Sequence, residues 1–462
     1  MSTISSDTLL SFDRDHLIHP VTSLRGHESR GATILTSGRG MYLTDMDGRE
    51  LIDAFAGLWC VNVGYGQESI VRAAADQMRR LPYATSYFSF GAEPTVLLAR
   101  RLIELAPSSL SHVFFTLGGS DAVDSAVRYI VHYFNALRRP RKKQFIALQR
   151  GYHGSSALGS GLTGLDNFHR HFDVPHPWQH HIPSPYPYRN PVGSDARAVI
   201  DQSVRQLRAK VKELGRENVA AFFCEPVQGS GGVIVPPVGW LRAMSETCAD
   251  LDVLFVVDEV ITGFGRTGPM FACEHEGVLP DLMTVAKGLT AGYVPMGAVL
   301  LSDQIYTAIA SAAGEDRVVG HGMTYSGHPV SAAVALEVLR LYLEGGILAN
   351  AQKMASKFAA GLKALSQHPL VGDARSKGML GALELVVNKE HRTPFDPSLN
   401  IPKRLFEAGY RNGIIFRAFA DCTLGLAPAL CCNDEEMELI FTRLRKTLDD
   451  MLAQPDVRRQ VR

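Results

Sequence analysis

The sequence predicts an α/β protein. A large domain has a mixed, mostly parallel sheet covered by helices, and a smaller α+β domain follows it. Two observations predict this class. Apolar strands followed by glycine-bearing polar loops and then by helical spacing recur through the middle of the chain. These strands are apolar throughout, which is typical of a sheet that is covered on both faces. The length of 462 residues suits two or three domains.

The first predicted elements lie in residues 34–53, "ILTSGRGMYLTDMDGRELID". Apolar and polar residues alternate here around Gly38-Arg39-Gly40 and Asp47-Gly48. This pattern predicts short antiparallel strands joined by tight turns.

The strand–loop–helix units come next. "VFFTLGGSDAVDSAVRYIVHYFNALRR", which starts at Val113, is a short strand, a glycine turn and a helix, because its later apolar residues follow helical spacing. Further strands are predicted in "KQFIALQRGYHG", "VAAFFCEPVQGSGG" and "VLFVVDEVITGFGR", with a helix over 195–215. The segment 172–193 is rich in Pro, His and aromatic residues, and we expect a long surface or interface loop there.

The C-terminal part begins with a predicted helix over 329–344. The stretches "MLGALELVV" and "GIIFRAF" behind it predict strands of the smaller domain. We therefore predict three parts: an N-terminal segment, 1–68, that contributes to the small domain; a large domain, 69–328; and a C-terminal small domain, 329–462.

Composition excludes several classes of function. Lys plus Arg and Asp plus Glu are both 47, so no basic field exists to hold nucleic acid or an anionic membrane. No apolar run reaches bilayer length and the N-terminus has no signal-peptide pattern, so we expect a cytoplasmic protein. The seven cysteines are scattered without C-x-x-C spacing, which predicts reduced thiols.

Three other sites are disfavoured. A P-loop needs a Gly-Lys dipeptide, and the chain has none. The string Gly159-Ser160-Gly161-Leu162-Thr163-Gly164 matches a dinucleotide motif but lies too far from its strand and lacks the acidic residue that follows in that motif. A metal site is not expected in the histidine-rich loop 169–181, because the spacing of its histidines among prolines matches neither a helical nor a zinc-ribbon metal motif. These histidines are His169, His171, His176, His180 and His181.

Candidate catalytic residues lie at predicted strand ends. Lys287 is the only charged residue between Asp281 and Asp303, and an unpaired lysine is rarely buried without a chemical reason. Asp258 closes another apolar strand. Gly119-Ser120 begins a helix, whose free N–H groups and positive dipole end suit a phosphate.

Pyridoxal phosphate needs all three of these features. Its aldehyde condenses with a lysine amine, its ring nitrogen stays protonated beside a carboxylate, and its phosphate needs an anchor. Each feature alone also has a purely structural interpretation, as a solvated strand-end acid or an N-terminal helix turn. Their combination predicts this cofactor.

The sequence resembles the class III aminotransferases, in particular the ω-transaminases that use amines and pyruvate. The resemblance spans nearly the whole chain and is carried by "GLWCVNVGYG", "GYHGSS", "EPVQGSGGVIVPP", "DEVITGFGRTG", "AKGLTAGYVPMGAV", "HGMTYSGHP" and "FRAFADCTLGLAPAL". It implies the aspartate-aminotransferase-like fold of pyridoxal-phosphate enzymes, fold type I. It also implies a homodimer whose active sites lie at the subunit interface, with a tetramer left open.

The resemblance also implies roles for residues around the cofactor. Lys287 forms the internal aldimine and then transfers a proton between substrate and cofactor, and Asp258 pairs with the ring nitrogen. Tyr152 and Val260 cover the two ring faces, while Glu225 lies nearby. The phosphate is held by Gly119 and Ser120 and by Thr324 of the neighbouring subunit. Three departures from the family pattern are Leu117 in place of a small polar residue, Asp121 in place of Glu and Ser230 in place of Ala.

The substrate pocket follows from the same resemblance. Trp59 and Phe88, with Tyr87 beside it, match positions that line an apolar pocket, to which Tyr152 and Ser230 also contribute. Arg417 matches a mobile arginine that pairs with the carboxylate of the amino acceptor and swings away for an uncharged amine.

The predicted function is amino transfer from a primary amine or ω-amino acid to an α-keto acid, with pyruvate expected, by a ping-pong mechanism. An aminotransferase for β-alanine or 4-aminobutyrate with pyruvate or 2-oxoglutarate is the alternative. A mutase, decarboxylase or racemase of the same fold and a non-catalytic cofactor-binding protein are disfavoured.

Overall fold

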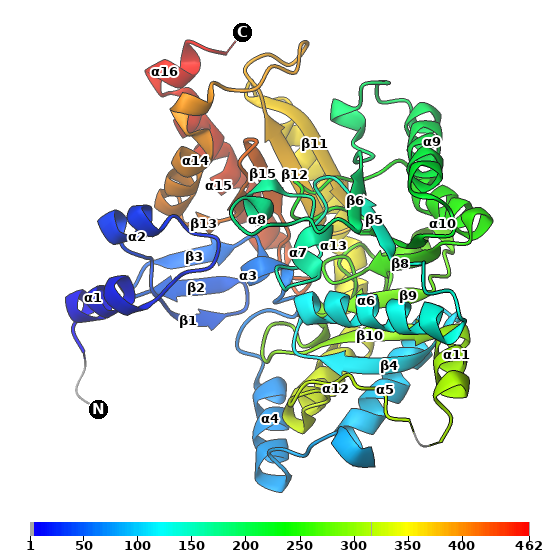
Figure 1. Cartoon of the computed structure of the whole chain (residues 1–462). Coiled ribbons are helices and arrows are strands. Elements are labelled where there is room, and N and C mark those ends of the chain that lie inside the picture. Colours follow the sequence, from blue (N-terminus) through cyan, green and yellow to red (C-terminus); the bar gives the residue numbers. More distant parts are fainter. Residues whose placement is uncertain (1–3, 316, 462) are drawn as a thin grey trace.

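The computed structural model describes residues 4–315 and 317–461, which form three sheets with helices around them (Figure 1). A seven-stranded sheet forms the centre of the largest part. A four-stranded sheet of mainly N-terminal strands and a four-stranded sheet of C-terminal strands lie beside it. No helix in the described part of the chain is long and apolar enough to cross a membrane. All seven cysteines are free thiols in this structure.

The central sheet is mixed and mostly parallel, which confirms the predicted class. Its strand order is β4-β10-β9-β8-β7-β5-β6. Only β10 runs antiparallel to its neighbours. The strands are β4 (Leu110–Thr116), β5 (Gln144–Leu148), β6 (Gln179–Ile182), β7 (Val219–Cys224), β8 (Leu254–Asp258), β9 (Leu282–Val285) and β10 (Gly297–Ser302).

Helices cover both faces of this sheet because its strands are apolar on both sides. Along β10, Ala298 and Leu300 belong to one hydrophobic core, whereas Val299 and Leu301 belong to the other. One face is covered by α6 (Gly119–Ala136), α7 (Gly159–Leu162) and α11 (Asp303–Ala313). The core on the other face includes side chains of α5 (Glu93–Leu105), α9 (Ala196–Leu214), α10 (Trp240–Leu251) and α12 (Pro329–Leu343), and α4 (Glu68–Arg80) packs on α12.

The N-terminal sheet joins the two ends of the chain. It contains the predicted antiparallel strands β1 (Leu35–Arg39), β2 (Tyr42–Asp45) and β3 (Glu50–Asp53), and β13 (Ile414–Ile415) pairs parallel with β3. The short helices α1 (Ser6–His16), α2 (Leu24–Arg30) and α3 (Ala56–Trp59) flank these strands in the chain. This pairing agrees with an N-terminal segment that contributes to the C-terminal part, although the domain boundaries stay a prediction.

The C-terminal sheet is antiparallel, with the order β11-β12-β15-β14. Its strands are β11 (Val371–Lys377), β12 (Leu380–Leu385), β14 (Arg417–Ala418) and β15 (Thr423–Leu426). The helices of this part are α13 (Ile347–Leu365), α14 (Ile401–Arg411), α15 (Asp434–Leu452) and α16 (Pro455–Arg458). The stretch "GIIFRAF", predicted as one strand, is two strands of different sheets, because the chain crosses between the sheets at Phe416, which is buried.

The loop predicted over 172–193 was wrong for four residues. Gln179–Ile182 form β6, an edge strand that pairs parallel with β5. Two of the histidines there have structural partners: His180 Nε2 lies 2.7 Å from Gln144 Oε1, and His181 Nε2 lies 3.0 Å from the Leu162 carbonyl oxygen. Pairing with β5 satisfies the backbone, which the segment's proline-rich composition did not reveal.

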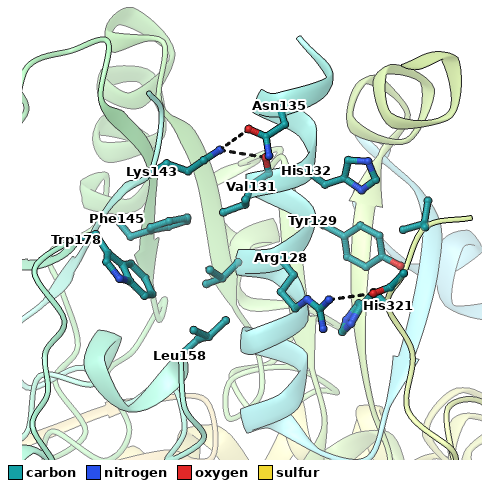
Figure 2. Close-up of a pocket in the computed structure, with 13 residues that line it drawn as sticks. Arg128, Tyr129, Val131, His132, Asn135, Lys143, Phe145, Leu158, Trp178 and His321 are labelled. Atoms are coloured by element: carbon teal, nitrogen blue, oxygen red, sulfur yellow. Dashed lines mark hydrogen bonds between the residues drawn. The ribbon is translucent and has the colours of Figure 1, made fainter. Parts of the chain in front are cut away.

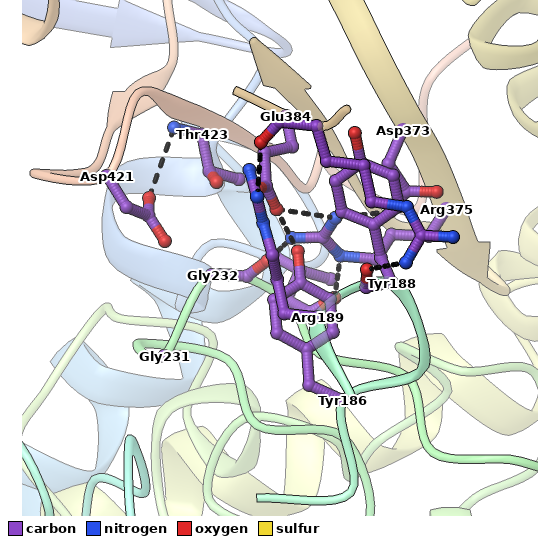
Figure 3. Close-up of polar contacts among 12 residues, drawn as sticks. Tyr186, Tyr188, Arg189, Gly231, Gly232, Asp373, Arg375, Glu384, Asp421 and Thr423 are labelled. Carbon is purple, nitrogen blue, oxygen red and sulfur yellow. Dashed lines mark hydrogen bonds and ion pairs between the residues drawn. The ribbon is translucent and has the colours of Figure 1, made fainter. Parts of the chain in front are cut away.

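A polar network fastens the C-terminal sheet to the loop after β7 and to the segment after β6 (Figure 3). Arg375 on β11 donates to the carbonyl oxygens of Gly232 and Val233, at 2.6 and 2.8 Å. Glu384 on β12 accepts from Arg189 Nε at 2.7 Å. These charge-assisted hydrogen bonds, which involve the buried side chains of Arg375 and Glu384, fix the positions of both segments relative to the C-terminal sheet.

Candidate active site

The carboxyl ends of three parallel strands meet at one edge of the central sheet. Glu225 follows β7, Asp258 ends β8, and Lys287 begins a 3-10 turn, Lys287–Leu289, just after β9. β7, β8 and β9 are neighbours, so these side chains converge. They line one cavity together with residues of two further loops: Gly119, Ser120, Tyr152, His153, Gly154, Glu225, Asp258, Val260, Ile261 and Lys287.

Lys287 has a strained backbone. Its φ of 42° lies in the left-handed region, which is uncommon for a residue with a side chain. The turn is held by a hydrogen bond from Tyr342 Oη to the Gly288 carbonyl at 2.7 Å and by the Leu289 N–H bond to the Ala286 carbonyl at 2.9 Å. Such backbone strain persists only where neighbouring contacts enforce it, and it is frequent at functional sites. Here the strained residue is the lysine that lines the cavity.

Asp258 has a buried carboxylate with two donors. His153 Nδ1 donates to it at 2.8 Å, and the Val260 N–H donates at 3.1 Å. Asp258 is 4% exposed, and the other ring nitrogen of His153, Nε2, is buried without a partner among the described residues. This pair places an oriented negative charge at the inner wall of the cavity.

Glu225 fastens two loops of the cavity. Its carboxylate accepts from the Tyr152 N–H at 2.9 Å and from the Gly229 N–H at 3.0 Å. Burial raises the pKa of Glu225 to about 7, and burial also raises the pKa of the Tyr152 phenol. Glu225 therefore positions the backbone of Tyr152 and the loop after β7.

Two glycines at the start of α6, one in the helix and one in the loop after β5, leave no space for additional side-chain atoms. A Cβ on Gly119 would lie 2.9 Å from Val260 Cγ1, and one on Gly154, whose φ is +102°, would lie 2.6 Å from Ser120 Oγ. Asp121 accepts from the Leu117 N–H at 2.6 Å, so the shorter acid still closes this turn. The first N–H groups of α6 thus face a cradle that suits an anion.

These residues fit pyridoxal phosphate. The cavity combines an amine, a buried carboxylate oriented by a histidine, and a glycine-built helix start, at the strand edge where such sheets bind ligands. The cavity has an empty volume of about 410 Å³.

The other predicted site residues lie outside this cavity. Trp59 is 3% exposed and packs on Phe55 in a cluster that also holds Ile261 and Phe419. Ile261 also lines the cavity, so this cluster adjoins it. Arg417 is exposed, with its guanidinium 5.7 Å from the Phe419 ring centre, and Ser230 is half-buried in the loop after β7.

Phe88 and Thr324 lie together on the surface instead. Phe88 is 86% exposed in the 3-10 turn Tyr87–Ser89, and Thr324 is also exposed. Their segments are side by side, because Tyr83 Oη donates to the Thr324 carbonyl at 2.9 Å and Ser86 Oγ donates to the Ser326 carbonyl at 2.9 Å.

A larger apolar cavity, with an empty volume of about 1030 Å³, lies against α6 (Figure 2). Its walls include Phe145, Leu158 and Trp178, and among the described residues no carboxylate lines it. Its Lys143 donates to Asn135 Oδ1 at 2.9 Å and to the Val131 carbonyl at 3.3 Å, both neutral acceptors. It lacks the paired amine and carboxylate of the smaller cavity, which remains the candidate active site.

Sequence reasoning missed four residues in or beside the site. His153 bonds Asp258, Gly154 and Ile261 line the cavity, and Phe419 lies beside Arg417. His153 directly follows Tyr152 and Ile261 directly follows Val260, in loops that come after predicted strands. This position in the sequence could have identified both residues. Phe419 carries no such signal, because its contacts are made only after folding.

The fold and the cavity define a pyridoxal-phosphate enzyme of the α/β class. The family model described as "Aminotransferase class-III" matches residues 25–448, and the chain belongs to this family, whose members depend on pyridoxal phosphate. It is an aminotransferase for amines or ω-amino acids.

Similar proteins cover nearly the whole chain. The putrescine–pyruvate aminotransferase of Pseudomonas aeruginosa is 43% identical over 448 residues, covering 96% of each chain. The diaminobutyrate–2-oxoglutarate transaminase of Halomonas elongata is 37% identical, also over 96% of each chain. The crystal structure of a thermostable (S)-enantioselective ω-transaminase from Thermomicrobium roseum superposes with a TM-score of 0.94 at 36% identity, covering 97% of this chain and 99% of that one.

Proposed function

We propose that this aminotransferase moves the amino group of a primary amine, such as a diamine, or of an ω-amino acid to pyruvate. The observation that carries the proposal is the 43% identity to a putrescine–pyruvate aminotransferase over 96% of both chains. The exposed Arg417 beside an apolar cluster agrees with it, because this arrangement can serve both an uncharged amine and a carboxylate.

The residues that line the cavity would hold the cofactor. Asp258 would face the ring nitrogen, and Gly119 with Ser120 would bind the phosphate at the start of α6. Tyr152 and Val260 would lie on the two faces of the ring. When bound, pyridoxal phosphate supplies the aldehyde that takes up an amino group and a ring that delocalises the electrons of the bond that breaks.

Lys287 would carry the proton in the reaction. Its amine, once free, would take a proton from the substrate carbon and return it one position away, as a base and then an acid. Asp258, oriented by His153, would keep the ring nitrogen protonated through its negative charge. Glu225 would hold Tyr152 in place through its backbone N–H.

Substrate selection would depend on the cluster next to the cavity. Trp59 and the partner subunit's Phe88 would form apolar walls, and Ser230 would add a hydroxyl. Arg417 would pair with the carboxylate of the keto acid.

A second copy of the chain would complete the site, with Thr324 of that copy on the phosphate. Five exposed aromatic residues support this interface, because they gather on the two adjoining segments that hold Phe88 and Thr324: Tyr83, Tyr87, Phe88, Phe90 and Tyr325. Sedimentation equilibrium should give twice the chain mass of 50.5 kDa. A monomer that is active at the same concentration would contradict this. The free cysteines agree with a reducing, cytoplasmic location.

Separate half-reactions test the function. Putrescine or 1-phenylethylamine alone should shift the visible absorbance band of the holoenzyme, and pyruvate should then restore it. Initial-rate lines in double-reciprocal plots should be parallel. Intersecting lines with no half-reaction would refute amino transfer through a shared cofactor.

Arg417→Ala should raise the KM for pyruvate by about tenfold to a hundredfold, because an ionic hydrogen-bonded pair is lost. The rate of the half-reaction with 1-phenylethylamine should change by less than about twofold, since that amine carries no carboxylate. Steady-state and single-turnover kinetics check this. An equal loss with both substrates would show that Arg417 has another role.

A second candidate is an ω-amino acid:2-oxoglutarate aminotransferase. It is favoured by the 37% identity to the diaminobutyrate–2-oxoglutarate enzyme. Acceptor preference separates the two: restoration of the absorbance band by 2-oxoglutarate but not pyruvate would support this candidate.

A further inference from the structure

Arg417 has one aromatic contact. It lies on β14, and its guanidinium is 5.7 Å from the centre of the Phe419 ring. Within residues 4–315 and 317–461, no hydrogen bond or ion pair of its side chain is found. An aromatic ring below a guanidinium attracts it through the ring quadrupole and leaves its N–H groups free for a carboxylate.

Phe419 is held firmly in this position. Its N–H donates to the Thr423 carbonyl at 2.8 Å, and its carbonyl accepts from the Cys422 N–H at 3.0 Å, which closes a tight turn. Gly425 lies opposite Arg417 in the strand register, and a Cβ there would be 2.6 Å from Phe419 Cε2. The missing side chain of Gly425 therefore makes room for the ring beside Arg417.

The same ring belongs to an apolar cluster that adjoins the active-site cavity. Phe419 is 8% exposed and belongs to the cluster of Phe55, Trp59 and Ile261, of which Ile261 lines the cavity. Phe419 therefore packs in this apolar cluster, and its ring also lies beside the Arg417 guanidinium.

We propose that Phe419 is a positioning residue for Arg417: its ring is the platform that holds the guanidinium ready for the carboxylate of the amino acceptor. This inference rests on the proposed role of Arg417.

The test is a double-mutant cycle on the full-length holoenzyme. Phe419→Leu keeps an apolar side chain but removes the ring, and should raise the KM for pyruvate about threefold to fivefold, as expected for a partly exposed cation–π contact. The half-reaction with 1-phenylethylamine should change by less than about twofold. In the Arg417→Ala background, the same substitution should leave the KM for pyruvate unchanged, because the partner of the ring is already missing.

Phe416→Leu is the matched control. Phe416 is 5% exposed, lies three residues earlier and packs in a different cluster, so its replacement should leave the KM for pyruvate unchanged. An equal rise from Phe419→Leu in both backgrounds would overturn the inference and assign Phe419 to packing alone. If Arg417→Ala itself leaves the KM for pyruvate unchanged, the proposed role of Arg417 fails first, so the two failures are distinguishable.

Discussion

Lys287→Ala should lower the rate of transamination by at least about 10³-fold while the protein stays folded. Among the described residues, Lys287 is the only lysine that lines the cavity. Its amine would both bind the cofactor and move the proton. The rate is measured with pyruvate and an amine, and folding by circular dichroism. The visible absorbance of the bound cofactor should shift as well.

Lys143→Ala is the matched control for this prediction. Lys143 is also half-buried and pairs with no carboxylate within residues 4–315 and 317–461, but it lies in the apolar cavity beside α6. Its loss should change the rate by less than about twofold, which is typical of positions away from a reacting centre. A Lys287→Ala enzyme that keeps a tenth of the activity would contradict the assigned role.

Asp258→Asn should lower kcat by about 10²-fold. The amide carries no negative charge, and an adjacent carboxylate raises the pKa of a cationic ring nitrogen by about one to three units. His153 would also lose the charged acceptor of its Nδ1–H. Single-turnover kinetics with an amine should show the slower proton transfer directly.

Asp281→Asn separates this effect from a loss of packing. Asp281 precedes β9, at the opposite end of that strand from Lys287, and its carboxylate accepts from the Phe255 N–H at 2.8 Å. Its replacement should affect stability more than kcat. If Asp258→Asn and Asp281→Asn lowered kcat equally, the effect of Asp258 would be on the stability of the fold and not on the reaction.

The strands and the core of the site could be predicted from the sequence. Apolar runs mark buried parallel strands, and parallel neighbours bring their carboxyl ends to one edge. Glu225, Asp258 and Lys287 therefore meet as expected, although they are far apart in the chain. The glycines at the start of α6 also predicted a phosphate site, because the N-terminus of a helix that follows a strand can bind a phosphate.

Other features could not be predicted, because they depend on contacts between distant segments. The edge strand β6 exists through its pairing with β5, and "GIIFRAF" divides between two sheets because each half finds a different partner strand. The pattern of apolar and polar residues within a strand does not determine which other strand it pairs with in the sheet.

The sequence by itself determined the fold class, the family resemblance and the residues that converge in the cavity, because burial pattern and strand-end position are local properties. Only the tertiary structure decided that His153 orients Asp258, that Glu225 fastens Tyr152, and that the Phe419 ring lies beside Arg417. These contacts depend on side-chain direction and on the packing of separate sheets, which no run of residues specifies alone.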